Sequence, residues 1–256
     1  MDELFSIRGK CALVTGGGSG IGWMIARGYA RAGARVYIAS RKRAELDARI
    51  AELGGEGDCH ALEADLSSEA GCNALADALE AREEKLHVLV NNAGANWGAP
   101  YAEFPEAAWD RVLDVNVKAV FALTRRLTPL LERTASAEDP ARVINIGSVD
   151  GINVPAMDTW AYAASKAAVH HLTRMLAKTL APKRITVNAV APGPFQSRMM
   201  RATLERLGDR VAGLVPLGRI GQPDDMAGVA IFLASRAGAY VDAAVIPVDG
   251  GLSGTR

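Results

Sequence analysis

Short, nearly continuous apolar runs recur along the chain and are separated by amphipathic segments. Such runs are typical of strands buried on both faces of a parallel sheet. Seven are present, the third of them the weakest: residues 11–14, 36–39, 59–64, 88–90, 143–146, 185–190 and 244–248. Apolar residues recur at helical spacing between several of these runs, in residues 21–32, 43–53, 107–131 and 162–180.

This alternation predicts an α/β fold in which helices cover both faces of a parallel sheet. The 256 residues hold no Pro/Gly/Ser-rich linker, internal repeat or low-complexity tract. Residues 1–256 are therefore predicted to form a single doubly wound domain of the Rossmann type. Ligands of such a domain bind at the carboxyl ends of the strands.

Composition narrows the class of protein. The 29 basic residues (Lys and Arg) balance the 29 acidic ones, which argues against a nucleic-acid surface or a polybasic membrane patch. The three cysteines form no CxxC pair, as is typical of a reducing compartment. No apolar stretch approaches the ~20 residues of a membrane span, and the acidic first residues do not resemble a secretory signal. A cytoplasmic location is expected.

A glycine cluster, Thr15-Gly-Gly-Gly-Ser-Gly-Ile-Gly22, joins the first apolar run to the first helical segment. Glycines at 16, 20 and 22 allow the backbone to turn sharply and to approach a diphosphate, while the helix N-terminus offers free N–H groups. The spacing is TGxxxGxG rather than the commoner GxGxxG. A flexible glycine turn is the alternative, which the flanking strand and helix weaken.

The second apolar run ends in Ser40-Arg41-Lys42-Arg43, without a carboxylate. NAD binders commonly place an acid there for the ribose hydroxyls, and an acid would repel the 2′-phosphate of NADP. Arginine can bind that phosphate through two hydrogen bonds. The segment therefore favours NADP(H), with a solvated basic helix start as the alternative.

The glycine loop and several later motifs together resemble those of the classical short-chain dehydrogenase/reductase family, and the resemblance extends from about Gly9 to Gly251. The glycine loop is followed, in the family's order, by Asp65-Leu66, Asn91-Asn92-Ala93-Gly94 and Pro192-Gly193. Four residues fall where the family has its catalytic tetrad: Asn116, Ser148, Tyr162 and Lys166. Segments 95–98, 144–148 and 191–199 are similar to the NADPH-dependent 3-oxoacyl reductases associated with rhamnolipid synthesis.

The resemblance implies a seven-stranded parallel sheet in the order 3-2-1-4-5-6-7, NADP(H) as cofactor, and a homodimer or homotetramer. It implies that the cofactor is bound by Gly16, Gly18, Ser19, Gly20, Ile21, Gly22, Ser40, Arg41, Lys42, Asp65, Leu66, Asn92, Ala93, Gly94, Tyr162, Lys166, Pro192, Gly193 and Ser197. Two positions depart from the family pattern. Ser19 stands where NADP-preferring members often have a basic residue, and Ser197 stands where threonine is common but keeps the hydroxyl.

Tyrosine is a poor acid because its unperturbed pKa is about 10. Lys166 follows Tyr162 by four residues, so both share one helix face, and its ammonium is expected to lower the tyrosine pKa. In the predicted reduction, Tyr162 protonates a carbonyl oxygen that Ser148 also binds. The family implies that Asn116 holds a water that relays protons from Lys166. Structural roles stay open: a helix-start tyrosine, a capping serine and a polar helix contact.

Residues 194–216 join the sixth apolar run to the next helix and, by the resemblance, cover the substrate. Their apolar residues suit an acyl chain, although helices packing on the body are an equal alternative: Phe195, Met199, Met200, Leu204, Leu207, Val211, Leu214 and Val215. The histidines at 60, 87, 170 and 171 lack metal-ligand spacing, so no metal is expected.

The leading hypothesis is an NADPH-dependent reductase that converts a carbonyl to a secondary alcohol, with a 3-oxoacyl thioester as substrate. One alternative is a related dehydrogenase of a sugar, polyol, steroid or small ketone. Another is a cofactor-binding sensor without turnover. The complete tetrad argues against the sensor, because binding alone does not require Tyr162 and Lys166 together.

Overall fold

A seven-stranded parallel sheet forms the centre of the computed structural model, which describes residues 3–197 and 200–255, the side chains of 201–204 and 207 excepted. All seven apolar runs are strands, and their order, β3-β2-β1-β4-β5-β6-β7, is the predicted one. The strands are β1 (Cys11–Thr15), β2 (Arg35–Ser40), β3 (Asp58–Glu63), β4 (Val88–Asn91), β5 (Ala141–Ile146), β6 (Ile185–Pro192) and β7 (Val245–Val248).

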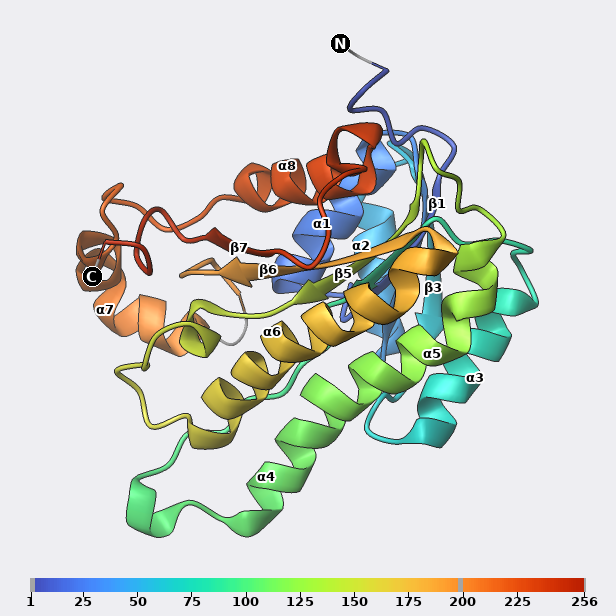
Figure 1. Cartoon of the computed structure of the whole chain (residues 1–256). Helices are drawn as coiled ribbons and strands as arrows, with labels where there is room; N and C mark the ends of the chain where they lie inside the picture. Colours follow the sequence, from blue (N-terminus) through green and yellow to red (C-terminus); the bar gives the residue numbers. More distant parts are fainter. Residues whose placement is uncertain (1–2, 198–199, 256) are drawn as a thin grey trace.

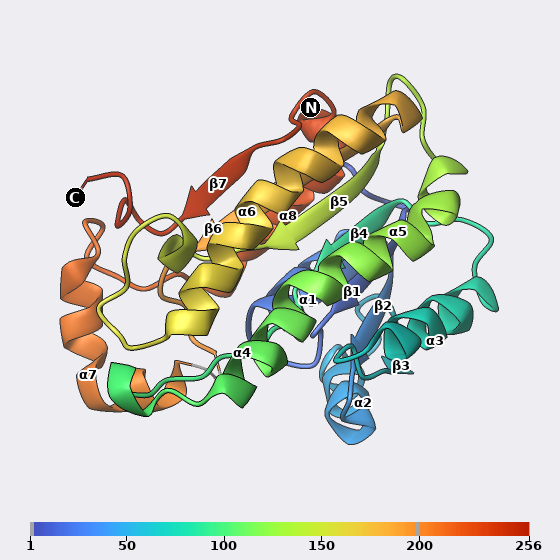
Figure 2. The same cartoon turned by 60° about the horizontal axis from the view of Figure 1, so that its bottom comes forward.

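Helices cover both faces of the sheet (Figures 1 and 2). One face is packed by α1 (Gly20–Arg31), α2 (Arg43–Glu52) and α8 (Pro223–Ala234), and the other by α3 (Glu69–Glu80), α5 (Ala119–Glu132) and α6 (Trp160–Leu180). Two further helices, α4 (Glu106–Leu113) and α7 (Arg201–Leu214), lie toward the carboxyl ends of the strands. None of the helices in the described residues is long and apolar enough to span a membrane.

The burial of each strand explains its sequence pattern. Every residue of β1, β4, β5 and β6 is buried, because these strands have a neighbour on each side and helices above and below. Only two residues of the edge strand β3 are buried, Cys59 on one face of the sheet and Leu62 on the other. An edge strand that buries so few positions needs fewer apolar residues, which accounts for its weak signal in the sequence.

The helical segment predicted over 107–131 is interrupted. A π-helical turn, η2 (Asp114–Lys118), separates α4 from α5. The prediction of one continuous α-helix is therefore wrong at this point. A π turn carries one extra residue and is common at functional sites. Here it accommodates Asn116, a residue that disfavours the interior of an ordinary α-helix.

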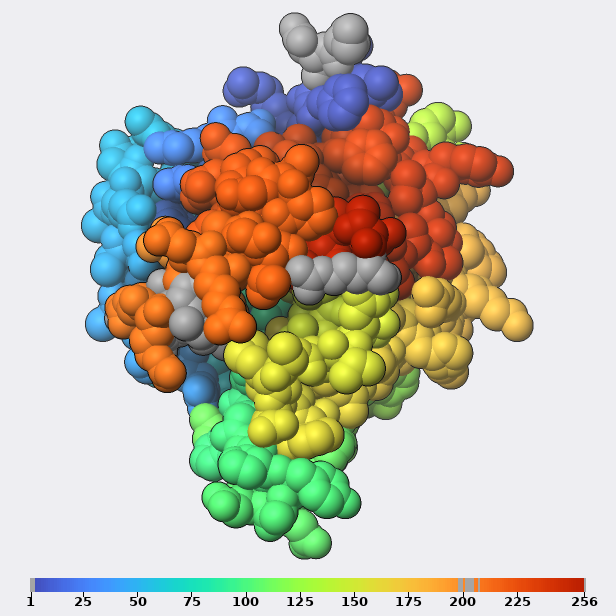
Figure 3. Space-filling model, turned by 90° about the vertical axis from the view of Figure 1, so that its left-hand side faces the viewer, coloured from blue at the N-terminus to red at the C-terminus, as the bar shows by residue number. Residues whose placement is uncertain are grey.

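The strand order reverses between β1 and β4, since β2 and β3 extend to one side and β5 to β7 to the other. In open α/β sheets, ligands bind outside the carboxyl ends of the strands at such a switch point. Figure 3 faces this edge of the molecule, where the green segment before α4, the yellow segment before α6 and the orange α7 region lie next to one another.

Candidate active site

The glycine loop lies between β1 and α1 at the switch point. Gly16 has a positive φ of 66°, and a Cβ on it would lie 2.7 Å from Nδ2 of Asn92. A Cβ on Gly22 would lie 2.4 Å from the same atom. The loop is therefore closed down onto the segment after β4. Thr15 fixes this arrangement because its Oγ1 accepts the N–H groups of Asn92 and Ala93, both at 3.0 Å.

The N-terminus of α1 is open toward the loop. Ser19 is the N-cap residue, but its side chain forms no capping hydrogen bond. Ile21 and Gly22 belong to the first turn, whose N–H groups have no partner within the helix. Free N–H groups and the positive end of the helix dipole fit a diphosphate at this point.

The predicted 2′-phosphate residues lie at the end of β2. A Cβ on Gly18 would lie 3.6 Å from Oγ of Ser40, so these two residues are close. Lys42 forms an ion pair with Glu45, with Nζ and Oε1 3.0 Å apart. The exposed Arg41 lines a cavity of about 480 Å³ together with Asp65. Cationic and acidic side chains thus face one space between the ends of β2 and β3.

The remaining predicted cofactor residues lie around the same edge. Gly193 follows β6, and its N–H donates to the Val248 carbonyl at 3.0 Å. Ser197 lies over the loop, because a Cβ on Gly20 would be 3.1 Å from Cβ of Ser197. Gly94 lies next to the tetrad: a Cβ there would be 3.3 Å from Oδ1 of Asn116 and 3.8 Å from Nζ of Lys166. Pro192 ends β6, and Leu66 is buried beside Asp65.

Ser148 lies two residues after the end of β5 and caps the short 3-10 turn η3 (Val149–Gly151). Its Oγ accepts the N–H of Asp150 at 3.1 Å, so the capping role considered from the sequence is present. The same hydroxyl lies close enough to Tyr162 to act on the pKa of the phenol. Capping does not exclude catalysis here, because it fixes the hydroxyl at the place where the tyrosine reaches it.

Tyr162 and Lys166 lie in the first two turns of α6. Nζ of Lys166 is 5.5 Å from the centroid of the Tyr162 ring and donates to the Ile146 carbonyl at 2.7 Å. Burial lowers the pKa of Lys166 to about 8. Burial raises the pKa of Tyr162 to about 12, the neighbouring Ser148 hydroxyl acts in the opposite direction, and the charge of Asp150 adds to the rise.

Lys166 was expected to lower the pKa of Tyr162, but in the protein without cofactor this pKa is raised. Desolvation of the phenolate outweighs an ammonium that is shared with a backbone carbonyl. A neutral phenol is the form that can give a proton to a carbonyl oxygen. The tyrosine is consequently set up as an acid before any charge appears in the site.

Asn116, in the π turn, makes three hydrogen bonds. Its Oδ1 accepts the Ala95 N–H at 2.7 Å, and its Nδ2 donates to the Ala95 carbonyl at 3.0 Å and to Oγ of Ser165 at 2.9 Å. Ser165 in turn donates to the Tyr162 carbonyl at 2.7 Å. The polar helix contact considered from the sequence is thus present, and it links the segment after β4 to the turn that carries the tyrosine.

Two residues of this region, Ser165 and Asp150, were not predicted from the sequence. Ser165 has no signal beyond its place between Tyr162 and Lys166. Asp150 is partly buried beside Tyr162, and its carboxylate forms no hydrogen bond or ion pair with the described residues. Its position two residues after Ser148 could have identified it, because the end of β5 was already predicted to hold the site.

Residues 194–216, which were expected to cover the substrate, are described only in part. The position of Met199, and the side chains of Leu204 and Leu207, lie outside the described residues. Phe195 and Val215 are buried against the body, which fits the packing alternative, whereas Leu214 is half-exposed. A cavity of about 540 Å³ lies between this segment and the end of β7, lined in part by Phe195, Leu217 and Asp249.

A protein-family model described as Enoyl-(Acyl carrier protein) reductase matches residues 16–253. The Rhamnolipids biosynthesis 3-oxoacyl-[acyl-carrier-protein] reductase of Pseudomonas aeruginosa is 50% identical over 253 residues, which cover 98% of this chain and 99% of that protein. The chain belongs to the short-chain dehydrogenase/reductase family. As a member, it is an oxidoreductase that acts on a carbonyl or its alcohol.

Other members of the family differ in the substrates that their names state. The galactitol 2-dehydrogenase (L-tagatose-forming) of Cereibacter sphaeroides is 38% identical and covers 97% of this chain and 96% of its own length. Membership alone therefore does not fix the substrate.

Solved structures of family members match the whole chain. The Pseudomonas aeruginosa RhlG/NADP active-site complex has a TM-score of 0.95 and 49% identity over 99% of this chain and 100% of that one. The gluconate 5-dehydrogenase from Burkholderia cenocepacia in complex with NADP and tartrate has a TM-score of 0.90 and 33% identity, with coverages of 100% and 99%. Both of these solved structures are complexes with NADP.

Proposed function

We propose that the protein uses NADPH to reduce the carbonyl group of a 3-oxoacyl thioester to a secondary alcohol. The observation that carries the proposal is the juxtaposition of the Ser148 and Tyr162 side chains, with Lys166 beneath the tyrosine ring, next to the glycine loop. Two neutral hydroxyl donors at one point can bind one carbonyl oxygen. The relative named as a 3-oxoacyl reductase supports the acyl substrate.

The side chains of the site divide the work of the reduction. NADPH, when bound, supplies the hydride. Ser148 holds the carbonyl oxygen, and Tyr162 donates its proton to that oxygen as negative charge develops there. Lys166, whose pKa of about 8 leaves most of it protonated at neutral pH, then stabilises the tyrosinate. Asn116 holds the Ala95 backbone and, through Ser165, the turn of α6 that carries Tyr162.

The geometry of the loop fits the dinucleotide. The diphosphate would be held by the Gly16–Gly22 loop and the open N-terminus of α1, where side chains would clash with Asn92. Ser40, Arg41 and Lys42 would hold the 2′-phosphate, while Asp65 and Leu66 would lie at the adenine. Asn92, Ala93, Gly94, Pro192, Gly193 and Ser197, together with Tyr162 and Lys166, would surround the nicotinamide half.

Arg41→Asp tests the cofactor assignment. An acid at 41 should repel the 2′-phosphate and accept ribose hydroxyls, so the ratio of kcat/KM for NADPH to that for NADH should fall by at least about tenfold. Arg43→Asp is the matched control, because Arg43 pairs with Asp47 on α2 rather than lining the cavity. An unaltered ratio in Arg41→Asp would remove this residue from the cofactor site.

Tyr162→Phe tests the reaction itself. It should lower kcat by roughly 10²- to 10⁴-fold, as loss of a general acid does, and leave the Kd of NADPH unchanged in a fluorescence titration. Tyr240→Phe, at a fully exposed position, is the control and should retain activity. Full activity of Tyr162→Phe would refute the mechanism.

Polyols and sugar acids are the second candidate substrates, since relatives named for galactitol and gluconate belong to the same family. We propose the acyl thioester first because the relative with 50% identity carries that name. Initial rates with 3-oxoacyl thioesters, keto-gluconates and galactitol, each with both cofactors, decide between them. Turnover of a polyol without turnover of any thioester would reverse the order.

We also propose a cytoplasmic location and a homodimer or homotetramer. The free, buried thiols of Cys11, Cys59 and Cys72 fit a reducing compartment. Half-exposed apolar residues lie on the long helices: Phe121 on α5 and Met175 on α6. Light scattering after gel filtration should give a mass of two or four chains, and Phe121→Asp should lower it. A monomer at micromolar concentration would refute the assembly.

A further inference from the structure

The loop that carries Ser148 is packed against α6 through two glycines. Gly147 precedes Ser148, and Gly151 ends the turn η3 that follows it. Neither has a positive φ, so neither needs to be glycine for its backbone conformation. Both need space: a Cβ on Gly151 would lie 2.6 Å from the carbonyl carbon of Lys166 and 2.7 Å from the N atom of Ala167.

His170 occupies the space that the missing side chains leave. A Cβ on Gly147 would lie 2.1 Å from its Nε2, and a Cβ on Gly151 would lie 2.9 Å from its Cε1. The imidazole is buried against the Gly151 backbone, and its Nε2 has no hydrogen-bond partner among the described residues. His170 thus lies between the two glycines, one helical turn beyond Lys166.

This packing determines how far Ser148 is from Tyr162. Ser148 is fixed to the end of β5, and Tyr162 and Lys166 are fixed to α6. The two elements meet where Gly147 and Gly151 contact Lys166, Ala167 and His170. A smaller or differently shaped group at 170 would let the loop shift toward α6, and the two hydroxyls would no longer bind one oxygen.

We propose that His170 is a positioning residue of the reaction: its imidazole, held between Gly147 and Gly151, fixes the Ser148 hydroxyl relative to Tyr162. The proposal rests on carbonyl reduction by Tyr162 and Ser148. It explains why a polar ring with an unpartnered nitrogen is retained in a buried position, where an apolar residue would avoid the cost of desolvation. His170 touches neither reacting atom in this role.

His170→Ala should lower kcat ten- to a hundredfold, the effect of a displacement of about 1 Å in a catalytic group. The Kd of NADPH depends on the glycine loop and should stay within twofold. The thermal midpoint of unfolding should change little compared with the loss of activity. His171→Ala is the matched control, since His171 is exposed, and should keep wild-type kcat. His170→Asn, which keeps a polar group for the Gly151 backbone, should recover part of kcat.

A double-variant cycle separates positioning from general packing. Gly147→Ala alone places a methyl group against Nε2 and should abolish most activity. Gly147→Ala/His170→Ala removes that clash, so its kcat should return to the level of His170→Ala. The proposal would be overturned if the kcat loss of the double variant equalled the product of the losses of the two single variants. A wild-type kcat for His170→Ala would also overturn it. Full activity of Tyr162→Phe would instead refute the proposed function itself, whatever the results at His170.

If His170→Ala does not yield folded enzyme, His170→Asn carries the same test. A kcat that falls with an unchanged Kd for NADPH supports positioning. A fall in kcat that is matched by an equal fall in cofactor affinity shows a general loss of structure and overturns it.

Discussion

Asp150 is an acid whose charge acts on Tyr162. Its N–H donates to Ser148, and its carboxylate raises the pKa of Tyr162 beyond the larger rise that burial causes. Burial also raises the pKa of Asp150 itself. A carboxylate at this point keeps the phenol protonated, which favours reduction over alcohol oxidation.

Asp150→Asn should therefore lower the pKa of Tyr162. Oxidation of the alcohol requires the tyrosinate, so kcat/KM for oxidation rises with pH through the pKa of the tyrosine. The rising limb should move to lower pH by roughly 0.5 to 1 pH unit, the size expected for removal of one nearby charge. Asp158→Asn, an exposed acid on the segment before α6, should leave the profile unchanged. An unshifted limb in Asp150→Asn contradicts the assignment.

Residue identities in this site were predictable where a motif fixes them. Tyr162 and Lys166 share a helix face because they are four residues apart, and Ser148 follows β5, so the three could be placed at one edge of the sheet from the sequence. The balance between burial and charge was not predictable. The direction of the Tyr162 pKa depends on how deeply the ring is buried and on which carbonyl binds Lys166. Neither is visible before the chain is folded.

At the scale of elements, a buried polar chain joins β4, β5 and α6. Nδ2 of Asn91 donates to Oδ1 of Asn145 at 2.9 Å, and Nδ2 of Asn145 donates to Oγ1 of Thr173 at 2.9 Å. All three residues are buried. Because two strands and a helix meet through Asn145, the chain fixes their relative positions just before Ser148.

Asn145→Val should destabilise the protein by about 1–3 kcal/mol, since it leaves buried polar partners unsatisfied. Urea unfolding followed by far-UV circular dichroism measures the change. Thr186→Val, on the neighbouring strand β6, is the matched control: its hydroxyl is buried without a partner among the described residues. That replacement should be neutral or stabilising. Equal losses for both variants would show that Asn145 contributes only its volume.

Element boundaries show where periodicity suffices and where it does not. The strands β1, β5 and β6 are buried throughout and mostly apolar, and each was found to within two residues. The π turn at Asp114–Lys118 was missed because its cause is distant in sequence. Asn116 bonds to Ala95, which lies 21 residues earlier, and helical spacing within 107–131 carries no trace of that contact.

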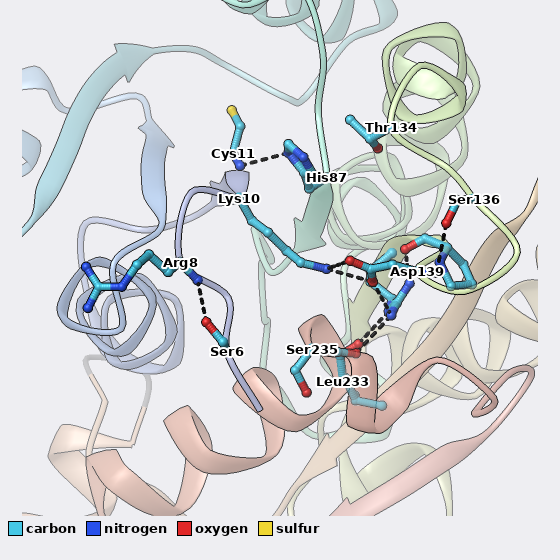
Figure 4. A network of polar contacts seen from close by, with 12 residues as sticks. Ser6, Arg8, Lys10, Cys11, His87, Thr134, Ser136, Asp139, Leu233 and Ser235 are labelled. Atoms are coloured by element: carbon cyan, nitrogen blue, oxygen red, sulfur yellow. Dashed lines mark hydrogen bonds and ion pairs between the residues drawn. The ribbon is translucent and has the colours of Figure 1, made fainter. Parts of the chain in front are cut away.

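The two edges of the molecule, at the carboxyl and the amino ends of the parallel strands, hold different kinds of residues. The proposed catalytic and cofactor residues lie at the carboxyl ends of the strands, whereas the amino ends hold a network of charged and polar groups (Figure 4). Nζ of Lys10 lies 2.7 Å from Asp139, and His87 Nδ1 accepts the N–H of Cys11 at 2.9 Å. Burial lowers the pKa of His87 to about 4, so the ring stays a neutral acceptor at physiological pH.

Arg142, at the start of β5, connects this network to α8. Its side chain is fully buried and donates to the carbonyls of Leu233 at 2.9 Å and Ser235 at 2.8 Å. It also pairs with Asp139 at 3.0 Å. One carboxylate therefore balances two largely buried cations, Arg142 from the same segment and Lys10 from a distant part of the chain.

Asp139→Ala should cost about 2–4 kcal/mol in the free energy of unfolding, because it leaves two buried cations without a counter-charge. The catalytic end should be insulated from this loss: six residues of extended chain, roughly 20 Å, separate Arg142 from Ser148. The midpoint of urea unfolding should therefore fall while kcat and KM at 25 °C stay at wild-type values. Glu138→Ala, at the exposed neighbouring position, should change neither. A parallel fall in kcat would show instead that the amino ends of the strands govern the geometry of Ser148 and Tyr162.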